Sequence, residues 1–287
     1  MPMPMPMPMP TSTPPVKLHQ IAYSPATLAD MEPGYAVLDN LANERPDWYE
    51  YWPLRRHLLV TEIDDTAYYG FFSPKFGAKT QLKHADVLHF VHTHAAQADV
   101  LLFSPQPDMA AFYLNVFEQG EAFDTGLTAA FEGFLASIGQ PQDLGGLVMD
   151  SRQSVFSNYF VATGAFWREW LRWTEALFAA CEGSDSPLRH ALTQPTSYPP
   201  AVQRKVFLIE RMASFVLATQ PRWRTCAADP FGFGWSMTRM REFPTEAVIS
   251  DALKRAHRDQ GWPEYLQAFS AIRQRCFIDP PASRNQA

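Results

Sequence analysis

The sequence of 287 residues is poor in cysteine. Its three cysteines, Cys181, Cys226 and Cys276, lie far apart. An odd number of scattered thiols does not build a disulfide framework, and it suits a reducing compartment better than an oxidising one. We interpret all three as buried thiols that pack like small apolar side chains.

Long apolar runs are missing as well. The longest, at residues 144–149 and 206–209, are far shorter than the roughly 20 residues that a membrane-spanning helix needs. The chain does not open with a basic stretch followed by an apolar run, which is the pattern of a secretory signal. We therefore expect no transmembrane segment and a cytoplasmic location.

Basic clusters are also absent. The formal net charge is −6, and lysines and arginines are scattered singly along the chain. A protein that follows a phosphate backbone usually gathers its cations into a stripe, so we expect no nucleic-acid partner. With 46% hydrophobic and 19% charged residues, the composition is typical of a globular protein.

The motifs of several enzyme classes do not occur. The sequence contains no Gly-x-Ser-x-Gly elbow, no Gly-x-Gly-x-x-Gly loop and no Walker-type phosphate loop. Residues 232–234 (GFG) lie late in the chain between aromatic residues, and we interpret them as a turn. These absences disfavour serine hydrolase, dinucleotide-binding and P-loop functions.

Three histidines, His89, His92 and His94, form the sharpest local metal-binding pattern. Their context predicts a helix, on which His94 would lie about 140° from His89. At this angle the three imidazole rings cannot bind one metal ion together. We therefore expect no metal there and interpret the cluster as a helix face, while a metal hydrolase remains a third, weaker alternative.

The chain begins with a strict Met-Pro alternation, and residues 1–15 as a whole contain too many prolines for a helix or a sheet ladder. We expect a disordered leader at residues 1–15, one α/β domain at residues 16–277 and a flexible tail at residues 278–287. Oligomeric state stays open.

Alternating strand and helix patterns fill the predicted domain. Period-two or wholly apolar runs predict strands at residues 17–24, 67–73, 99–104 and 155–162. Helical spacing predicts helices at residues 43–59, 80–95, 108–120, 126–138, 165–181, 201–218, 246–258 and 264–277. This order predicts an α/β layer fold with a helical C-terminal third.

Several short segments, taken in order, resemble one family. They are NERPDW at residues 43–48 with YWPLR at 51–55, YYGFFSPKF at 68–76, DVLLFSP at 99–105 with YLNVF at 113–117, NYFVA at 158–162 with FWREW at 166–170, and VFLIER at 206–211. In this order they resemble the GT-A-like glycosyltransferase domains encoded with bacterial capsular and exopolysaccharide biosynthesis genes. The likeness touches most of residues 17–220 and leaves the C-terminal 65 or so residues uncovered.

The resemblance implies a GT-A-like (Rossmann-like) mixed sheet flanked by helices. It also implies transfer of a sugar from a nucleotide-sugar donor to a glycan acceptor in surface-polysaccharide assembly. Many such enzymes hold Mn²⁺ or Mg²⁺ with an Asp-x-Asp motif, which this chain lacks. The nearest analogue, residues 62–65 (EIDD), precedes a predicted strand, where acidic residues are usually solvated. The cofactor therefore stays open. The alternative function is a catalytically silent domain of this fold that binds a glycan or a protein.

Six residues are candidates for the chemistry that the resemblance implies. Glu210 could act as a base with Arg211 as its partner, and Asn158 could bind a sugar or acceptor hydroxyl. The remaining substrate-binding candidates are Asp39 for the base or ribose, and Arg55 and Lys75 for the phosphates. Because polar residues inside apolar segments need a wet space, we expect Asn158, Glu210 and Arg211 to meet in one cleft.

Overall fold

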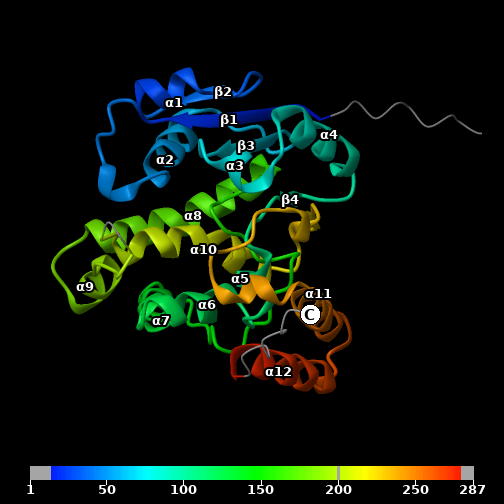
Figure 1. The fold of residues 1–287 in the computed structure, drawn as a ribbon. Coiled ribbons are helices and arrows are strands. Elements are labelled where there is room, and N and C mark those ends of the chain that lie inside the picture. Colours follow the sequence, from blue (N-terminus) through cyan, green and yellow to red (C-terminus); the bar gives the residue numbers. More distant parts are fainter. Residues whose placement is uncertain (1–13, 199–200, 279–287) are drawn as a thin grey trace, which may run out of the picture.

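The computed structural model describes residues 14–198 and 201–278, and in this part of the chain six strands form one mixed sheet (Figure 1). The strands lie in the order β2-β1-β3-β5-β4-β6. Their bounds are β1 Val16–Ala22, β2 Ala36–Asp39, β3 Tyr68–Phe72, β4 Val100–Leu102, β5 Phe160–Thr163 and β6 Thr225–Ala227. The predicted α/β class with a mixed sheet flanked by helices is confirmed.

All strands except β5 run in one direction. Strand β1 pairs in parallel with β2 and β3, β4 pairs in parallel with β6, and β5 is antiparallel to both β3 and β4. Gly70 lets β3 and β5 approach closely, because a Cβ atom there would lie 2.8 Å from the Val161 side chain. The carboxyl ends of five strands and the amino end of β5 therefore share one edge of the sheet.

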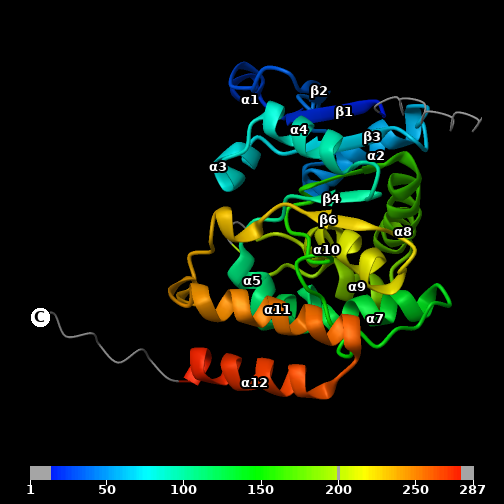
Figure 2. The ribbon, with the colours of Figure 1, turned by 90° about the vertical axis from the view of Figure 1, so that its right-hand side faces the viewer.

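Helices cover both faces of the sheet, and the C-terminal helices lie beyond it (Figures 1 and 2). Their bounds are α1 Pro25–Ala29, α2 Tyr51–Val60, α3 Phe76–Thr80, α4 His84–His94, α5 Pro107–Ala111, α6 Val116–Phe123, α7 Leu127–Ser137, α8 Gly164–Glu182, α9 Pro187–Thr193, α10 Arg204–Thr219, α11 Pro244–Gln260 and α12 Pro263–Ile278, with 3₁₀ turns η1 Pro46–Trp48, η2 Pro230–Gly232 and η3 Arg239–Glu242. The predicted helical C-terminal region is confirmed. In the described residues no helix has the length and apolarity that a bilayer crossing requires.

Successive side chains of the strands enter two separate apolar cores. Tyr69 and Phe71 of β3 join the larger core with α2, α6, α7, α8 and α10, whereas Tyr68 and Phe72 join the core beneath α3 and α4. The strand sequence YYGFF is buried at every position, as expected for a strand that is covered on both faces. A third, smaller cluster holds α11 and α12 against α5 and includes Cys276.

Buried thiols account for two of the three cysteines. Cys181 and Cys276 are buried, whereas Cys226 in β6 is only partly covered. Burial raises the pKa of Cys181 to about 12. The interpretation of the cysteines as packing residues is confirmed for Cys181 and Cys276 and is wrong in degree for Cys226.

Several predicted boundaries differ from the structure where the backbone turns left-handed. The helix expected at residues 43–59 is split into η1 and α2 at Tyr49, which has φ 48°. The strand expected at residues 155–162 begins only at Phe160, because Ser157 and Asn158 have φ 59° and 53°. Asn115 caps α6 through its side chain and so divides the helix expected at residues 108–120.

The predicted domain boundaries lie close to the ends of the described chain. Residues 1–13 of the expected leader and 279–287 of the expected tail lie outside the described residues. Pro15, which we assigned to the leader, accepts a hydrogen bond from the backbone N–H of Tyr68 at 2.8 Å. The sheet therefore begins to form contacts inside the segment that was expected to be disordered.

Candidate active site

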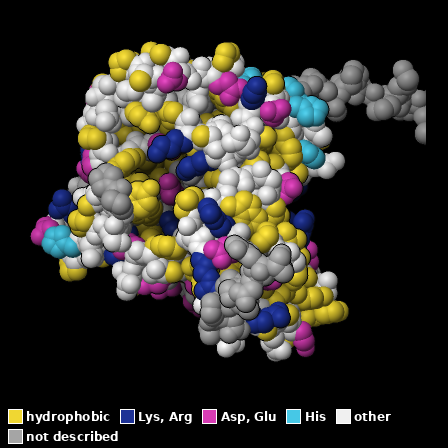
Figure 3. Space-filling model, viewed as in Figure 1, with side chains coloured by type: hydrophobic (Ala, Val, Ile, Leu, Met, Phe, Trp, Pro, Cys, Tyr) yellow, Lys and Arg dark blue, Asp and Glu magenta, His cyan; other side chains and the backbone are white. Residues whose placement is uncertain are grey.

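A cavity of about 600 Å³ opens at the carboxyl edge of β1, β2 and β3. Figure 3 shows that this side of the molecule is hollowed, with basic, acidic and hydrophobic side chains meeting there. The walls come from the loops after these three strands, the start of α2, helix α3, the turn before β5 and the first half of α10. We call this cavity the edge pocket.

The position of the edge pocket follows from the strand order. The chain passes from β1 to β2 on one side and then returns to β3 on the other side of β1. The chain then leaves β3 for β4 on the far side, so the connections after β1 and β3 lead to opposite ends of the sheet, and the edge pocket lies between them. In open α/β sheets, ligands bind at such a switch point outside the carboxyl ends of the strands.

An unusual backbone conformation marks the walls of the edge pocket. In the described chain, six non-glycine residues have positive φ, and four of them line this pocket. These four are Asn43, Tyr49, Ser157 and Asn158. Left-handed backbone at a non-glycine residue costs free energy and tends to occur at functional sites, where it fixes the direction of a side chain.

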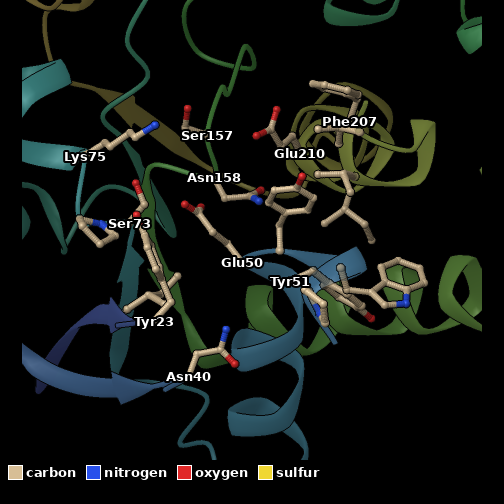
Figure 4. A pocket seen from close by; sticks show the side chains of 18 of the residues that line it. Tyr23, Asn40, Glu50, Tyr51, Ser73, Lys75, Ser157, Asn158, Phe207 and Glu210 are labelled. Atoms are coloured by element: carbon tan, nitrogen blue, oxygen red, sulfur yellow. The ribbon is translucent and has the colours of Figure 1, made fainter. Parts of the chain in front are cut away.

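Two carboxylates face the interior of the edge pocket. Figure 4 shows the side chains of Glu50 and Glu210 pointing into one space with Asn158 between them. Burial first, and then the charge of Glu210, raise the pKa of Glu50 to about 7 against the opposing effects of Lys79, Ser73 and Lys75. Burial also raises the pKa of Glu210, while Arg211 and Lys79 oppose this shift.

Two lysines enter the edge pocket from the segment that follows β3. Lys75 precedes α3 and is exposed, and no ion pair joins it to another described residue. Lys79 lies one helical turn later, where its ammonium group donates to the Ser157 hydroxyl at 2.8 Å. The spacing of four residues puts both cations on the same side of this turn.

Two buried side-chain amides have acceptor oxygens without a partner. Asn40 and Asn158 are 4% and 5% exposed, and within the described chain the Oδ1 atom of each accepts no hydrogen bond. Leaving a buried acceptor unpaired costs free energy, so each oxygen can gain a bond from a ligand O–H or N–H. Both side chains line the edge pocket.

An aromatic wall closes the side of the edge pocket that belongs to α10. Tyr198 and Phe207 meet edge to face with their ring centroids 5.7 Å apart, and Trp48 and Tyr49 line the same cavity. Trp48 is held by a hydrogen bond from its indole N–H to Glu182 at 2.9 Å. Such a wall offers flat apolar surfaces with polar edges, which suits a sugar ring or a nucleobase.

Three of the six predicted site residues line the edge pocket, namely Lys75, Asn158 and Glu210. They come from three separate segments, as the sequence analysis expected for Asn158 and Glu210. Their roles in binding and catalysis stay predictions.

The other three predicted residues lie outside the edge pocket. Asp39 ends β2 on the exposed side and accepts from the Leu41 N–H at 2.8 Å, and the pocket side is occupied by the next residue, Asn40. Arg55 lies on another face of α2, where Nε and Nη2 donate to Glu175 at 2.5 and 2.8 Å. A bidentate ion pair already satisfies this guanidinium group.

Arg211 points away from Glu210 and is buried between α10 and α6. Its guanidinium group donates to the Val116 carbonyl at 2.8 Å, to Gln119 Oε1 at 2.6 Å and to the Phe207 carbonyl at 3.0 Å. Gly120 leaves the room for it, because a Cβ there would lie 2.8 Å from Arg211 Nε. The expectation that Arg211 shares the cleft is wrong, since successive residues of a helix project about 100° apart.

Sequence reasoning missed Glu50, Lys79, Asn40 and Ser157. Glu50 is the one acidic residue inside the aromatic run WYEYW at residues 48–52, and this contrast could have identified it. Lys79 repeats Lys75 at helical spacing directly after a buried strand, which is a second usable signal. The left-handed turn that presents Ser157 has no comparable signature in the sequence.

The histidines and the acidic segment that we considered as metal sites take other positions. His89 and His92 are exposed on α4, and the His94 ring packs on Phe90 with centroids 4.4 Å apart. Asp64 caps the turn before β3, and Asp65 pairs with Arg168 at 2.6 Å. Among the described residues, no group of three or more His, Cys, Asp or Glu side chains is placed to hold a metal ion.

Comparisons with known proteins add no family or relative to this description. A scan against protein-family models, a search of curated proteins and a search of solved structures each found no match.

Proposed function

We propose that the protein is a glycosyltransferase that moves a sugar from a nucleotide-sugar donor to the hydroxyl of a glycan acceptor. The observation that carries the proposal is the edge pocket at the switch point of the sheet, where two lysines, two carboxylates and two unpaired amide oxygens meet. The GT-A-like identity and the setting in bacterial surface-polysaccharide assembly rest on the sequence resemblance. The three scattered cysteines, which suit a reducing compartment, support a cytoplasmic location.

The two lysines would bind the diphosphate of the donor. Phosphate oxygens accept hydrogen bonds from ammonium groups, and Lys75 and Lys79 are the lysines that line the edge pocket in the described chain. Positive charge at this point also stabilises the nucleoside diphosphate as it leaves. Because Lys75 has no ion-pair partner among the described residues, its charge is available to a ligand.

The acceptor atoms of the pocket would bind the sugars. Asn40 and Asn158 each present a buried oxygen without a donor, and Glu50 and Glu210 add carboxylate oxygens. A surplus of acceptors suits a ligand that is rich in hydroxyl groups. The aromatic wall with Tyr198 and Phe207 would then stack against a ring of the acceptor.

A divalent ion is not part of this proposal. The described residues contain no group of three or more metal-binding side chains, so we derive no step through Mn²⁺ or Mg²⁺. The binding experiment nevertheless includes Mn²⁺ and Mg²⁺, since the phosphates of a nucleotide commonly bind a divalent ion.

Isothermal titration of the full chain with UDP, GDP, CDP and ADP, each with EDTA, Mn²⁺ or Mg²⁺, tests the proposal. We expect at least one nucleoside diphosphate to bind and Lys75→Gln to weaken that binding about tenfold, whereas the exposed Lys83→Gln should not. If none of the four nucleotides binds under any condition, the proposal is wrong. If one binds and its nucleotide sugars are neither transferred nor hydrolysed, the silent binding domain becomes the better function.

A further inference from the structure

We propose that Glu50 is the residue that takes the proton from the acceptor hydroxyl, and that Glu210 is a positioning residue that acts on Glu50 from across the edge pocket. The inference rests on the proposed function and names the catalytic residue of the same site. Sequence reasoning assigned the base to Glu210, and the geometry points to Glu50 instead.

The position of Glu50 in the edge pocket favours it as the base. Figure 4 shows Glu50 between Lys75 on one side and Phe207 on the other, in the space that joins the phosphate-binding side to the aromatic wall. The acceptor hydroxyl must meet the anomeric carbon of the donor between these two sides. A base has to lie within hydrogen-bond reach of that hydroxyl.

The backbone also fixes the direction of the Glu50 side chain. It stands at the very start of α2, directly after Tyr49 with φ 48° and ψ −130°. This residue of positive φ separates η1 from α2, and the Glu50 side chain that follows it points into the pocket. A non-glycine residue in this conformation is costly, and sites of catalysis are where such cost is commonly retained.

The charges around the Glu50 carboxyl group favour the same role. Glu210 faces Glu50 from α10, Lys79 and Lys75 from the α3 side, Ser73 from directly after β3 and Tyr159 from directly before β5. Burial raises the pKa of Glu210, while the charges of Arg211 and Lys79 oppose this shift. Burial first, and then the negative charge of ionised Glu210, raise the pKa of Glu50 to about 7, which suits a base that works near neutral pH.

The proposed step balances as follows. The acceptor O–H gives its proton to a carboxylate oxygen of Glu50, and the freed electron pair forms the new bond to the anomeric carbon. The bond from that carbon to the diphosphate oxygen breaks, and its electron pair leaves with the nucleoside diphosphate. Lys75 and Lys79 meet the negative charge that develops on the leaving oxygen.

The first experiment needs no substrate. NMR of the full chain with ¹³C at the side-chain carboxyl of glutamate should show one resonance that titrates near pH 7. We expect it to disappear in Glu50→Gln and to move to lower pH in Glu210→Gln, because removing a negative neighbour makes ionisation easier. The exposed Glu62→Gln is the control and should leave the resonance unchanged. If no glutamate titrates above about pH 5.5, or if the resonance persists in Glu50→Gln, the proposal is overturned.

The second experiment uses the nucleotide that binds in the titration and its nucleotide sugars. Glu50→Gln should lower kcat by about 10²- to 10⁴-fold while the affinity for the nucleoside diphosphate stays within about twofold. Glu210→Gln should shift the acidic limb of the pH–rate profile to lower pH, because it removes a negative neighbour of Glu50. Full activity in Glu50→Gln, or an unshifted limb in Glu210→Gln, would overturn the assignment.

Folding and function can be separated in this design. If Glu50→Gln does not fold, the wild-type resonance and its shift in Glu210→Gln decide the question, with Glu50→Asp as the conservative variant. Absence of nucleotide binding together with the expected titration would refute the proposed function alone. Nucleotide turnover without the expected titration would refute the role of Glu50 alone.

Discussion

The ammonium group of Lys79 donates a hydrogen bond to the hydroxyl of Ser157 over 2.8 Å. This contact joins α3, which follows β3, to the left-handed turn that precedes β5. It keeps the lysine directed across the edge pocket and above the Tyr159 ring, 5.5 Å from its centroid. The two segments lie far apart in the sequence and become one wall of the site.

Lys79→Gln should weaken binding of a nucleoside diphosphate, because it removes a charged donor from the proposed phosphate side. A hydrogen bond to a charged group contributes about 1.5 kcal/mol or more, which is roughly tenfold in Kd. Isothermal titration at fixed ionic strength measures the change. Lys83→Gln changes a lysine that is exposed beyond α3 and should keep the wild-type Kd. Equal affinity in both variants would remove Lys79 from the site.

Arg211→Met should destabilise the fold without changing nucleotide affinity. The arginine side chain is buried and donates to Val116 O and Gln119 Oε1, which the variant leaves without their donor. We expect unfolding free energy to fall by about 2–4 kcal/mol in urea titrations. Arg241→Met on the exposed η3 turn should change it by less than about 0.5 kcal/mol. A loss of nucleotide affinity in folded Arg211→Met would restore this residue to the site.

Two buried histidines should make stability depend on pH. The rings of His19 and His57 lie 4.8 Å apart, and the side-chain atoms His19 Nδ1 and His57 Nε2 have no partner in the described chain. Burial first, and then the charge of His57, lowers the pKa of His19 from 6.5 to about 4. Burial and the charge of Lys17 lower the pKa of His57 as well.

Both histidines are therefore neutral in the folded protein at pH 7. As pH falls below 6.5, the unfolded chain takes up protons that the folded chain does not, so stability is lost progressively towards about pH 4. The loss from His19 alone should approach 3 kcal/mol, on the order of 1.4 kcal/mol per pH unit. Urea titrations at several pH values should show a flatter dependence for His19→Gln and the wild-type dependence for the exposed His92→Gln. Parallel curves for wild type and His19→Gln would contradict the assignment.

Two glycines should respond oppositely to alanine. A Cβ at Gly164 would lie 2.1 Å from the Asp64 carbonyl oxygen, which belongs to the backbone and cannot move aside cheaply. Gly164→Ala should therefore lower the unfolding free energy by about 2 kcal/mol or more. At Gly133, inside α7, the nearest atom would be a Leu188 methyl group at 3.5 Å.

Gly133→Ala should be neutral or stabilising by up to about 1 kcal/mol, because alanine favours the helix. Thermal and urea unfolding of the two variants side by side provide the test. A stable Gly164→Ala variant would show that the start of α8 can shift away from the turn before β3.

The sequence predicts the strongly patterned elements and misses those that depend on tertiary contacts. Strands β1, β3 and β4 and helices α8, α10, α11 and α12 lie close to their expected positions, since each has a clear apolar period or a continuous buried run. Strands β2 and β6 were missed. They are short, and β2 lies at the sheet edge with Val37 half exposed, so little apolar pattern marks them.

The site was predicted only in part for a related reason. Asn158 and Glu210 could be identified because each is a polar residue within an apolar segment. The direction of a side chain from its helix could not be seen in the same way, and Arg55 and Arg211 prove to be satisfied by Glu175 and by α6. The direction of the Glu50 side chain depends on the positive φ of Tyr49, a conformation that the sequence around Tyr49 does not favour.

The reversed direction of β5 has a consequence for how the protein can be assayed. Its amino end brings Asn158 to the pocket, where it meets the loop after β1 and the wall formed by α10, so segments from Ile21 to Glu210 must all be in place. A chain that has formed only its first parallel strands has half of the pocket that we propose binds a nucleotide. Ligand binding should thus appear late during refolding, after most of the tryptophan fluorescence and far-UV circular dichroism signals have recovered. Nucleotide affinity would then serve as a stringent measure of complete folding.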